Sequence, residues 1–594
     1  MSETEADSTP VAEGSSKPWN PWLAIPLWLV LPFVAAPLRV PVPAELKRNK
    51  GFIWLGLTVV VFVVGVIVRH LYIYKLHNPN DYVYSDMKMY VDLARRLNQP
   101  DYKLGIGDIT HPPGNTWLLQ YFMQSDPAKL MGLVRLNFIV ASLVPLAMGF
   151  LGWVAFPAKK LADAAAKPAG LATRILVGLS RERTAQVAII LGSVYFPYID
   201  FGGYYLAEIH MTLTATLCIA LYLLAMRLVA DPEVVVEGPT SRAQTYRSAT
   251  DRPKDAPTPI GMVAHLRATI RERPGRVVVA VLCAAIGGFL FSFAMALKMV
   301  AMLAIGGFVA THFFLSRKPR WLLRVAIAFV FVVAALPLTK KMVTRCTEAN
   351  VEPGETVGHF CTGSNKSAAD FLLGHKGRIQ GIEWRDPKVP GVVGFGNPAA
   401  YQHGYREKAV VPFLITNQAE NNKAAWDWVK KNKGEALVLS FEHVWDSFGG
   451  SYPWPPNATK IWPFSYAFHF LFLVFILFPA LVRLTDVLRD RGVVGLLRSD
   501  EFILLSPIFG VCAAVFLATG EVRYRIPWDP VFFLLAIEFY RKITYRFWEP
   551  APVVGSLLPL DPRPTVQAST NEASASHDDD DRADEAQEEE REDA

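Results

Sequence analysis

The sequence is poor in charge. Only 19% of its 594 residues are charged, against about 25% in soluble domains, while 52% are apolar. The apolar residues gather into runs of about 16 to 25 residues, the length that a helix needs to cross about 30 Å of hydrocarbon. This pattern excludes an ordinary soluble domain and predicts an integral membrane protein.

Cysteine is also scarce. The five cysteines are too few for a disulfide-built scaffold, and no Cys and His residues have the spacing of a zinc site. Cys218, Cys283 and Cys512 lie inside apolar runs, where a small buried side chain is the simplest interpretation. Cys346 and Cys361 differ from these, because both lie in one polar loop.

No cleavable signal peptide is evident in the first twenty residues, which are polar and acidic, so we expect the first spans to direct membrane insertion. The net charge of +6 conceals an acidic end from Asp578 to Ala594, and the rest of the chain is distinctly basic. The basic residues flank the apolar runs, which indicates membrane-adjacent loops and argues against nucleic acid as a partner.

Ten apolar runs predict transmembrane helices, and a proline-rich run at 22–40 is a span, a re-entrant segment or an interfacial helix. The fold class predicted is therefore an all-α polytopic membrane protein with ten or eleven transmembrane helices. The ten runs cover residues 52–74, 133–156, 185–200, 204–229, 277–296, 299–316, 321–338, 463–484, 502–519 and 526–541.

Lys and Arg residues gather in every second loop, and such loops tend to stay in the cytoplasm. The alternate loops, chiefly 75–132, 339–462 and 520–525, are then predicted to lie on the non-cytoplasmic side. The regions are a polar N-terminal part with the uncertain apolar segment (1–51), a first membrane region that includes the first external loop (52–338), an external loop region (339–462), a second membrane region (463–548) and a disordered acidic tail (549–594).

The external loop region contains Cys346 and Cys361, which this topology places in an oxidising compartment. A disulfide between them would close a loop of about 15 residues, and two free thiols are the alternative. Two amphipathic stretches, at 421–432 and 437–448, predict helices in the same region.

The first external loop carries an acid, a histidine and helix-breaking residues. Ser85 is predicted to cap a helix that begins near Asp86 and presents an apolar stripe at Tyr90, Leu93, Ala94 and Leu97. An ionised carboxylate at a helix N-terminus suits a general base or a metal ligand, although it is also consistent with a cap or a surface charge.

Six further residues suggest chemistry. His111 begins an HPPG sequence that reads first as a tight turn into the next helix. Glu208 and Lys298 lie within or between apolar runs, where a charge usually faces a cavity or a partner, interfacial snorkelling being the alternative for Glu208. Arg523, Tyr524 and Arg525 suit either a phosphate or lipid headgroups.

The order of these parts resembles the GT-C superfamily of integral-membrane glycosyltransferases, particularly the branch of protein O-mannosyltransferases and the bacterial lipid A aminoarabinose transferase. The resemblance rests on Asp86, Tyr90 and Ala94 with HPPG at His111 to Gly114, YYLAE at Tyr204 to Glu208, RYRIP at Arg523 to Pro527, and the loop sequence from Gly363 to Gly377.

The resemblance implies a membrane enzyme that transfers a sugar from a polyprenyl-phosphate donor to a protein, lipid or glycan acceptor on the non-cytoplasmic face of the plasma (inner) membrane. In that scheme Asp86 activates the acceptor or contributes to a divalent metal site, and Ser85 and Met87 flank it where relatives often carry paired acids. His111, Glu208, Lys298, Arg523, Tyr524 and Arg525 then bind substrate. The alternative is a transporter or lipid flippase, in which Asp86, Glu208 and Lys298 line a translocation path.

Overall fold

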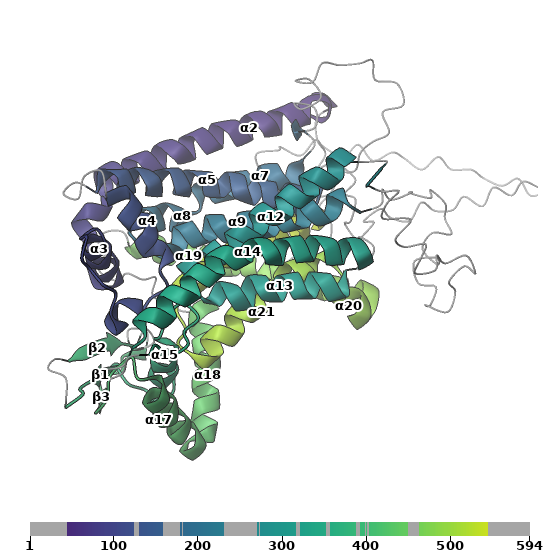
Figure 1. Ribbon diagram of the computed structural model, residues 1–594. Helices are drawn as coiled ribbons and strands as arrows, with labels where there is room; N and C mark the ends of the chain where they lie inside the picture. The colour runs from purple at the N-terminus through teal and green to yellow at the C-terminus, as the bar shows by residue number, and fades with distance from the viewer. Residues whose placement is uncertain are drawn as a thin grey trace, which may run out of the picture. The chain divides into compact units, whose positions relative to one another are not determined.

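The computed structural model describes residues 44–123, 130–157, 179–180, 182–230, 270–271, 274–316, 321–351, 357–387, 392–397, 400, 403–448 and 462–543. The proline-rich run at 22–40 and the acidic tail at 549–594 lie outside these residues. The described part is mostly helical (Figure 1).

Seven helical segments are long and apolar enough to cross a membrane. They are α2 (Ala44–Leu71) with the turn Tyr72–Leu76, α5 (Met131–Ala155), α9 (Ala207–Leu228), α12 (Pro274–Leu297), α14 (Trp321–Ala349), the joined α19 (Trp462–Phe472) and α20 (Phe478–Leu497), and α21 (Asp500–Leu517). An eighth candidate is a pair of helices, α7 (Arg183–Val194) and α8 (Phe196–Asp200) with Phe201–Gly203, bent by 61°. Pro197 lies in the first turn of α8, where it cannot continue the helix that precedes it.

The criteria of length and composition give seven or eight candidate spans among the described residues, against the ten or eleven predicted. Every predicted run coincides with helix, but two of these helices are short. They are α13 (Val300–Leu315), with 16 residues, and α23 (Asp529–Ile543), with 15. The hydrophobicity of the sequence alone does not distinguish these short helices from helices long enough to span the membrane.

The helices differ in how much of their apolar surface other helices cover. In α9, 72% of the most apolar stretch is buried, whereas in α2 only 11% is. An apolar helix whose side chains remain uncovered requires an apolar surrounding, so α2 faces lipid. The start of α9, where Glu208 lies, is enclosed by protein.

The predicted helical membrane fold is confirmed, and the external loop region adds one small sheet to it. Three short strands, β1 (Gly381–Trp384), β2 (Val393–Gly396) and β3 (Lys408–Val411), form a sheet in the order β2-β1-β3, with β1 antiparallel to β2 and parallel to β3. The sheet shares a small hydrophobic core with α15 (Ser367–Gly374) and α17 (Gln418–Lys431). Four-residue strands are too short to show alternation in the sequence. The two predicted amphipathic helices are present as α17 and α18 (Lys433–Phe448).

The first external loop folds into α3 (Ser85–Leu97), a 3-10 turn at Ile106–Ile109, and α4 (Gly114–Met123). The residue that precedes α3 is Tyr84, which makes no side-chain capping bond, so the predicted cap by Ser85 is wrong. Ser85 instead has a φ of 50°, a left-handed conformation at the entry to the helix. HPPG turns the chain into α4 as predicted, and Gly114 packs so closely on the backbone of Ala296 and Leu297 that no Cβ fits.

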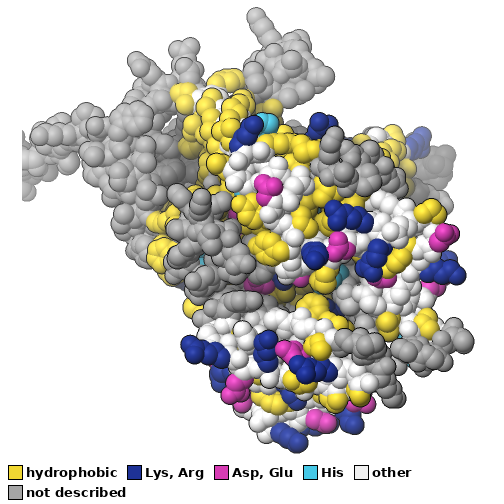
Figure 2. Space-filling view, turned by 90° about the vertical axis from the view of Figure 1, so that its left-hand side faces the viewer, with side chains coloured by type: hydrophobic (Ala, Val, Ile, Leu, Met, Phe, Trp, Pro, Cys, Tyr) yellow, Lys and Arg dark blue, Asp and Glu magenta, His cyan; other side chains and the backbone are white. Residues whose placement is uncertain are grey.

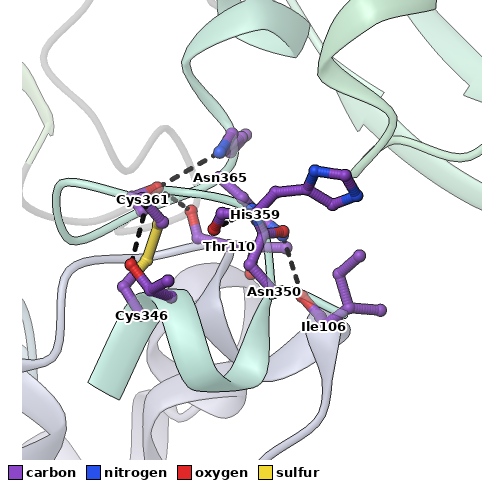
Figure 3. Close-up of a disulfide and its surroundings, with 10 residues drawn as sticks. Ile106, Thr110, Cys346, Asn350, His359, Cys361 and Asn365 are labelled. Carbon is purple, nitrogen blue, oxygen red and sulfur yellow. Dashed lines mark hydrogen bonds between the residues drawn. A yellow bond between two sulfur atoms is a disulfide. The ribbon is translucent and has the colours of Figure 1, made fainter. Parts of the chain in front are cut away.

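Cys346 and Cys361 form the predicted disulfide, with their Cα atoms 5.4 Å apart (Figure 3). The segment that follows Cys361 is bonded to the first external loop: Ser364 donates to the carbonyl of Thr110, and Asn365 donates from its side chain to the carbonyl of Ile106. The disulfide thus anchors a segment that joins two loops distant in the sequence.

Replacing Cys346 and Cys361 together with alanine is expected to lower the free energy of unfolding by about 3 kcal/mol, the loop-closure contribution for a 15-residue loop. Denaturation of the purified protein in detergent, with and without reductant, measures this. The variant should also lose the effect of the reductant, whereas Cys512→Ala should retain it. An unchanged stability in the double variant would contradict the anchoring role.

Candidate functional site

Charged side chains from distant parts of the chain converge on Arg523, which lies in the short helix α22 (Val522–Arg525). Its Nη1 donates to Asp86 Oδ2 at 3.0 Å, at the start of α3. Its Nε lies 2.7 Å from Glu521 Oε2 and 4.0 Å from Glu208 Oε1, in the first turn of α9. Asp86 and Arg523 are 437 residues apart in the sequence, so only the fold brings them together.

Lys298 joins the same group from the break between α12 and α13. Its Nζ donates to Glu208 Oε1 at 2.6 Å, and the Glu208 side chain is 1% exposed. The Lys298 ammonium also lies 4.9 Å from the centre of the Tyr524 ring, and the Arg523 guanidinium lies 5.4 Å from it. The sequence predicted that Glu208 and Lys298 each face a cavity or a partner, and they are partners of one another.

The external loop region supplies one more ion pair. Lys366 Nζ lies 3.3 Å from Asp370 Oδ1 and 4.0 Å from the centre of the Phe395 ring. Both residues of the pair interact electrostatically with Asp86. The charged cluster therefore has four acids and three bases: Asp86, Glu208, Asp370 and Glu521 with Lys298, Lys366 and Arg523. Figure 2 shows the face with α3 and the sheet, where side chains of both signs are interspersed.

The surroundings of Asp86 keep it ionised. Burial is the largest single influence and raises its pKa, but the charge of Arg523, its hydrogen bond to Asp86 and the charge of Lys366 together outweigh burial, and the pKa of Asp86 falls well below its usual range. Burial raises the pKa of Glu521 in spite of the nearby Arg523. Glu521 therefore takes up a proton more readily than an ordinary glutamate does, while Asp86 holds its negative charge.

His111 lies beside the cluster as a neutral ring. Burial and the nearby Lys366 lower its pKa to about 4, so the imidazole is uncharged at neutral pH. Its ring centre is 5.3 Å from that of Tyr90, and its Nε2 is buried without a hydrogen-bond partner among the described residues. A neutral imidazole can either donate or accept a hydrogen bond.

Arg525, although only two residues from Arg523, belongs to a different group. Its Nε donates to Asp529 Oδ1 at 2.7 Å, and its guanidinium lies 3.9 Å from the centre of the Phe472 ring. The structure thus brings together six of the seven predicted residues and places Arg525 elsewhere. Because α22 is helical, successive side chains point in different directions, which the alternating spacing in the sequence did not reveal.

Sequence reasoning also missed Glu521, Lys366 and Asp370. Glu521 stands two residues before Arg523, and Lys366 and Asp370 stand four apart on a short helix. Glu521 lies in the predicted external loop 520–525, and Lys366 and Asp370 lie in the loop sequence 363–377 that resembles GT-C enzymes. A systematic search of those segments for charges of opposite sign would have found them.

The described residues do not fit a divalent metal ion. No group of three or more His, Cys, Asp or Glu side chains in this part of the chain is arranged to hold one. The carboxylates of Asp86 and Glu208 are instead bonded to the guanidinium of Arg523 and the ammonium of Lys298. No chemical step is therefore assigned to a metal.

Replacing Lys298 with methionine is expected to destabilise the fold by about 3 kcal/mol, because Glu208 would keep a buried charge without its closest partner. Arg523, 4.0 Å from Glu208, compensates in part, so the effect falls at the lower end for a broken buried pair. The double variant Glu208→Gln/Lys298→Met should recover most of the loss. Denaturation in detergent measures this, with the exposed Lys88→Met as control, and a double variant no more stable than Lys298→Met would contradict the pairing.

Comparisons with known proteins give only distant similarity. No model of a known protein family matches the chain, and no curated protein matches it. Among solved structures, the chain is similar to the oligosaccharyltransferase of Archaeoglobus fulgidus tethered with an acceptor peptide, with a TM-score of 0.41 and 11% identity over 86% of this chain and 52% of that one. It is likewise similar to that archaeal enzyme, AglB, in complex with an inhibitory peptide and a dolichol-phosphate, with a TM-score of 0.41 and 12% identity over 82% of this chain and 51% of that one.

The chain therefore spans about half the length of these structures. With TM-scores below 0.5, they support no functional conclusion by themselves. The function of this chain has to be inferred from its own residues.

Proposed function

We propose that this protein is a membrane glycosyltransferase that moves a sugar from a polyprenyl-phosphate donor to an acceptor on the non-cytoplasmic face. The observation that carries the proposal is the pairing of Asp86 with Arg523 at 3.0 Å, beside Lys298. Glycosyl transfer needs a base for the acceptor and cations for the departing phosphate, and this group offers both. The motifs that resemble GT-C enzymes contain the same residues.

In the proposed reaction, the acceptor's hydroxyl or amide nitrogen loses a proton to the Asp86 carboxylate. The freed electron pair forms a bond to the anomeric carbon of the sugar. The bond from that carbon to the phosphate oxygen breaks, and the electron pair leaves with the polyprenyl phosphate, whose charge Arg523 and Lys298 stabilise. Attack opposite the leaving group inverts the configuration at the anomeric carbon.

The same ion pair suggests how donor binding prepares the base. Arg523 has five N–H donors and holds Asp86 with one of them. A donor phosphate competes for that guanidinium, and as Arg523 turns toward the phosphate its effect on Asp86 weakens. The pKa of Asp86 then rises from its depressed value, so that the carboxylate becomes a stronger base when the donor is present.

The position of the cluster suits a lipid-linked substrate. Glu208 is in the first turn of α9, Lys298 follows the end of α12, and Asp86 lies in the loop after the first span. A polyprenyl-phosphate has its phosphate at the membrane edge and its tail in hydrocarbon, and both environments meet where spans end. A transporter would instead be expected to bind its substrate near the bilayer midplane.

The remaining polar groups suit the sugar and the acceptor. His111 offers a neutral ring nitrogen beside Asp86, and Lys366 brings a third cation, from the external loop region. The cations of Lys298 and Arg523 both lie over the ring of Tyr524. We assign these residues to substrate binding and Asp86 to catalysis.

The test is sugar transfer by membranes that contain the protein, with a panel of radiolabelled polyprenyl-phosphate sugars and a matched cell-envelope extract as the source of acceptor. Incorporation of label from one donor supports the proposal and names the sugar. Movement of an intact donor between leaflets, with no label incorporated from any donor, would favour the flippase alternative and overturn the enzymatic one.

A further inference from the structure

Helix α18 has its polar and apolar faces reversed relative to a helix that packs on a protein surface in water. Its most exposed large side chains are apolar: Trp445 is 66% exposed, Phe441 61%, Leu437 53% and Val438 49%. Positions 437, 441 and 445 are four residues apart and form one stripe along the helix. An ordinary amphipathic helix in a soluble domain would bury this stripe.

The opposite face of α18 is buried and largely polar. Ser440 Oγ lies 3.0 Å from His375 Nε2, and the Asp446 carboxylate lies 3.0 Å from His403 Nε2. Ser447 donates to the carbonyl of His443 within the helix. Ser440, Asp446 and Ser447 thus have partners inside the protein, and these bonds hold α18 with its apolar stripe facing outward.

The apolar stripe is continuous with a membrane span. The Phe441 ring lies 5.5 Å from that of Phe516, near the end of α21. Phe509 on α21 is 50% exposed and lies seven residues before Phe516, on the same face of that helix, and the adjacent Leu517 is 53% exposed. The surface that α21 presents to lipid therefore continues onto α18, which runs across the direction of α13 and α14 in Figure 1.

The same helix is fixed to the charged cluster. Gly520 lies so close to the backbone of His443 that a Cβ would not fit, and Gly374 is similarly close to Ala518 and His443. Glu521 and Arg523 follow Gly520 directly. The position of α18 and that of the cluster are thus linked through closely packed backbone, so both lie at the same membrane edge.

We propose that α18 is an interfacial helix whose stripe of Leu437, Val438, Phe441 and Trp445 lies among the lipid acyl chains of the leaflet nearest the charged cluster. A helix with this composition lies in the plane of the interface with its apolar face in lipid. Lys433, the first residue of α18, and Lys430 and Lys431, which end α17 just before it, are exposed and can reach headgroup phosphates. Trp445 is of the residue type favoured at this depth. The partner surface is therefore the lipid bilayer, and the proposal does not depend on the enzymatic activity.

The test measures the depth of single labels in reconstituted protein. Cys218, Cys283 and Cys512 are replaced with alanine, and Leu437→Cys, Phe441→Cys and Trp445→Cys are each labelled with an environment-sensitive fluorophore. In nanodiscs that contain doxyl-labelled lipid, emission at all three positions should shift to shorter wavelength and be quenched. Lys423→Cys, exposed on the neighbouring α17, is the control and should show neither effect.

Two results would overturn the proposal. Labels at all three positions that behave like the control would show that the stripe faces water. Labels that are shielded but not quenched by lipid, together with disulfide cross-linking of Phe441→Cys between copies, would show that a second copy of the chain covers it. Each substituted side chain is at least half exposed, and Leu437→Cys and Trp445→Cys leave the contact between Phe441 and Phe516 in place, so the three positions provide independent readings.

Discussion

Asp86→Asn is expected to reduce sugar transfer by about 10²- to 10⁴-fold, the usual contribution of a general base. Asparagine keeps the size of the side chain and can still contact Arg523, but it cannot take the acceptor's proton. The loss should appear in turnover more than in the affinity for the donor, because Arg523 and Lys298 remain. Initial rates at varied donor concentration measure both.

The matched control is Asp92→Asn. Asp92 lies on the same helix, is half exposed, and its nearest cation, Arg95, is 3.5 Å away and equally exposed. Its replacement should leave transfer and stability unchanged. Equal activity of Asp86→Asn and wild type would remove Asp86 from the mechanism. Denaturation of Asp86→Asn, measured alongside, separates a loss of chemistry from a loss of fold.

Arg523→Gln is expected to reduce turnover by about 10²- to 10³-fold, as is typical when one group that stabilises developing charge is removed. The guanidinium is also the strongest favourable influence on Asp86, so its removal should raise the pKa of that carboxyl. Asp86 acts as a base only when ionised. The acid limb of the pH–rate profile should therefore move to higher pH in the variant.

Arg523→Lys separates the two effects. Lysine keeps the positive charge near Asp86 but lacks the planar fork that binds phosphate with two parallel bonds. It should thus lose turnover while the acid limb moves less than in Arg523→Gln. Arg378→Gln is a control, since Arg378 is exposed and pairs with Glu442 outside the cluster. An unmoved acid limb in Arg523→Gln would contradict the link between Arg523 and Asp86.

The sequence identified charged residues of the cluster more readily than it identified their partners. Glu208 and Lys298 were identified because a charge in an apolar run is costly unless it has a partner, and this cost is the same whatever the fold. Asp86 pairs with Arg523 because the first external loop packs against α22. No local sequence pattern encodes this contact. The same limit explains Arg525, which stands beside Arg523 in sequence and contacts a separate group.

The errors in the fold have equally local causes. Hydropathy located every helix that was predicted as a span, but it did not distinguish α13 and α23, which are too short by length, from full spans. Ser85 is a good capping residue, yet its left-handed φ places Tyr84 at the cap. The reversed amphipathicity of α18 is visible in sequence only as periodicity, and the side that faces outward was settled by the contacts of Ser440 and Asp446.

The proposed glycosyl transfer can be tested by measuring both products of the donor, in proteoliposomes that contain the purified protein, an acceptor and one labelled polyprenyl-phosphate sugar. Free polyprenyl phosphate and glycosylated acceptor are expected to appear in equal amounts, and both should be lost in Asp86→Asn. Recovery of the donor intact, or its cleavage at the same rate in Asp86→Asn as in wild type, would contradict a transferase in which Asp86 is the base.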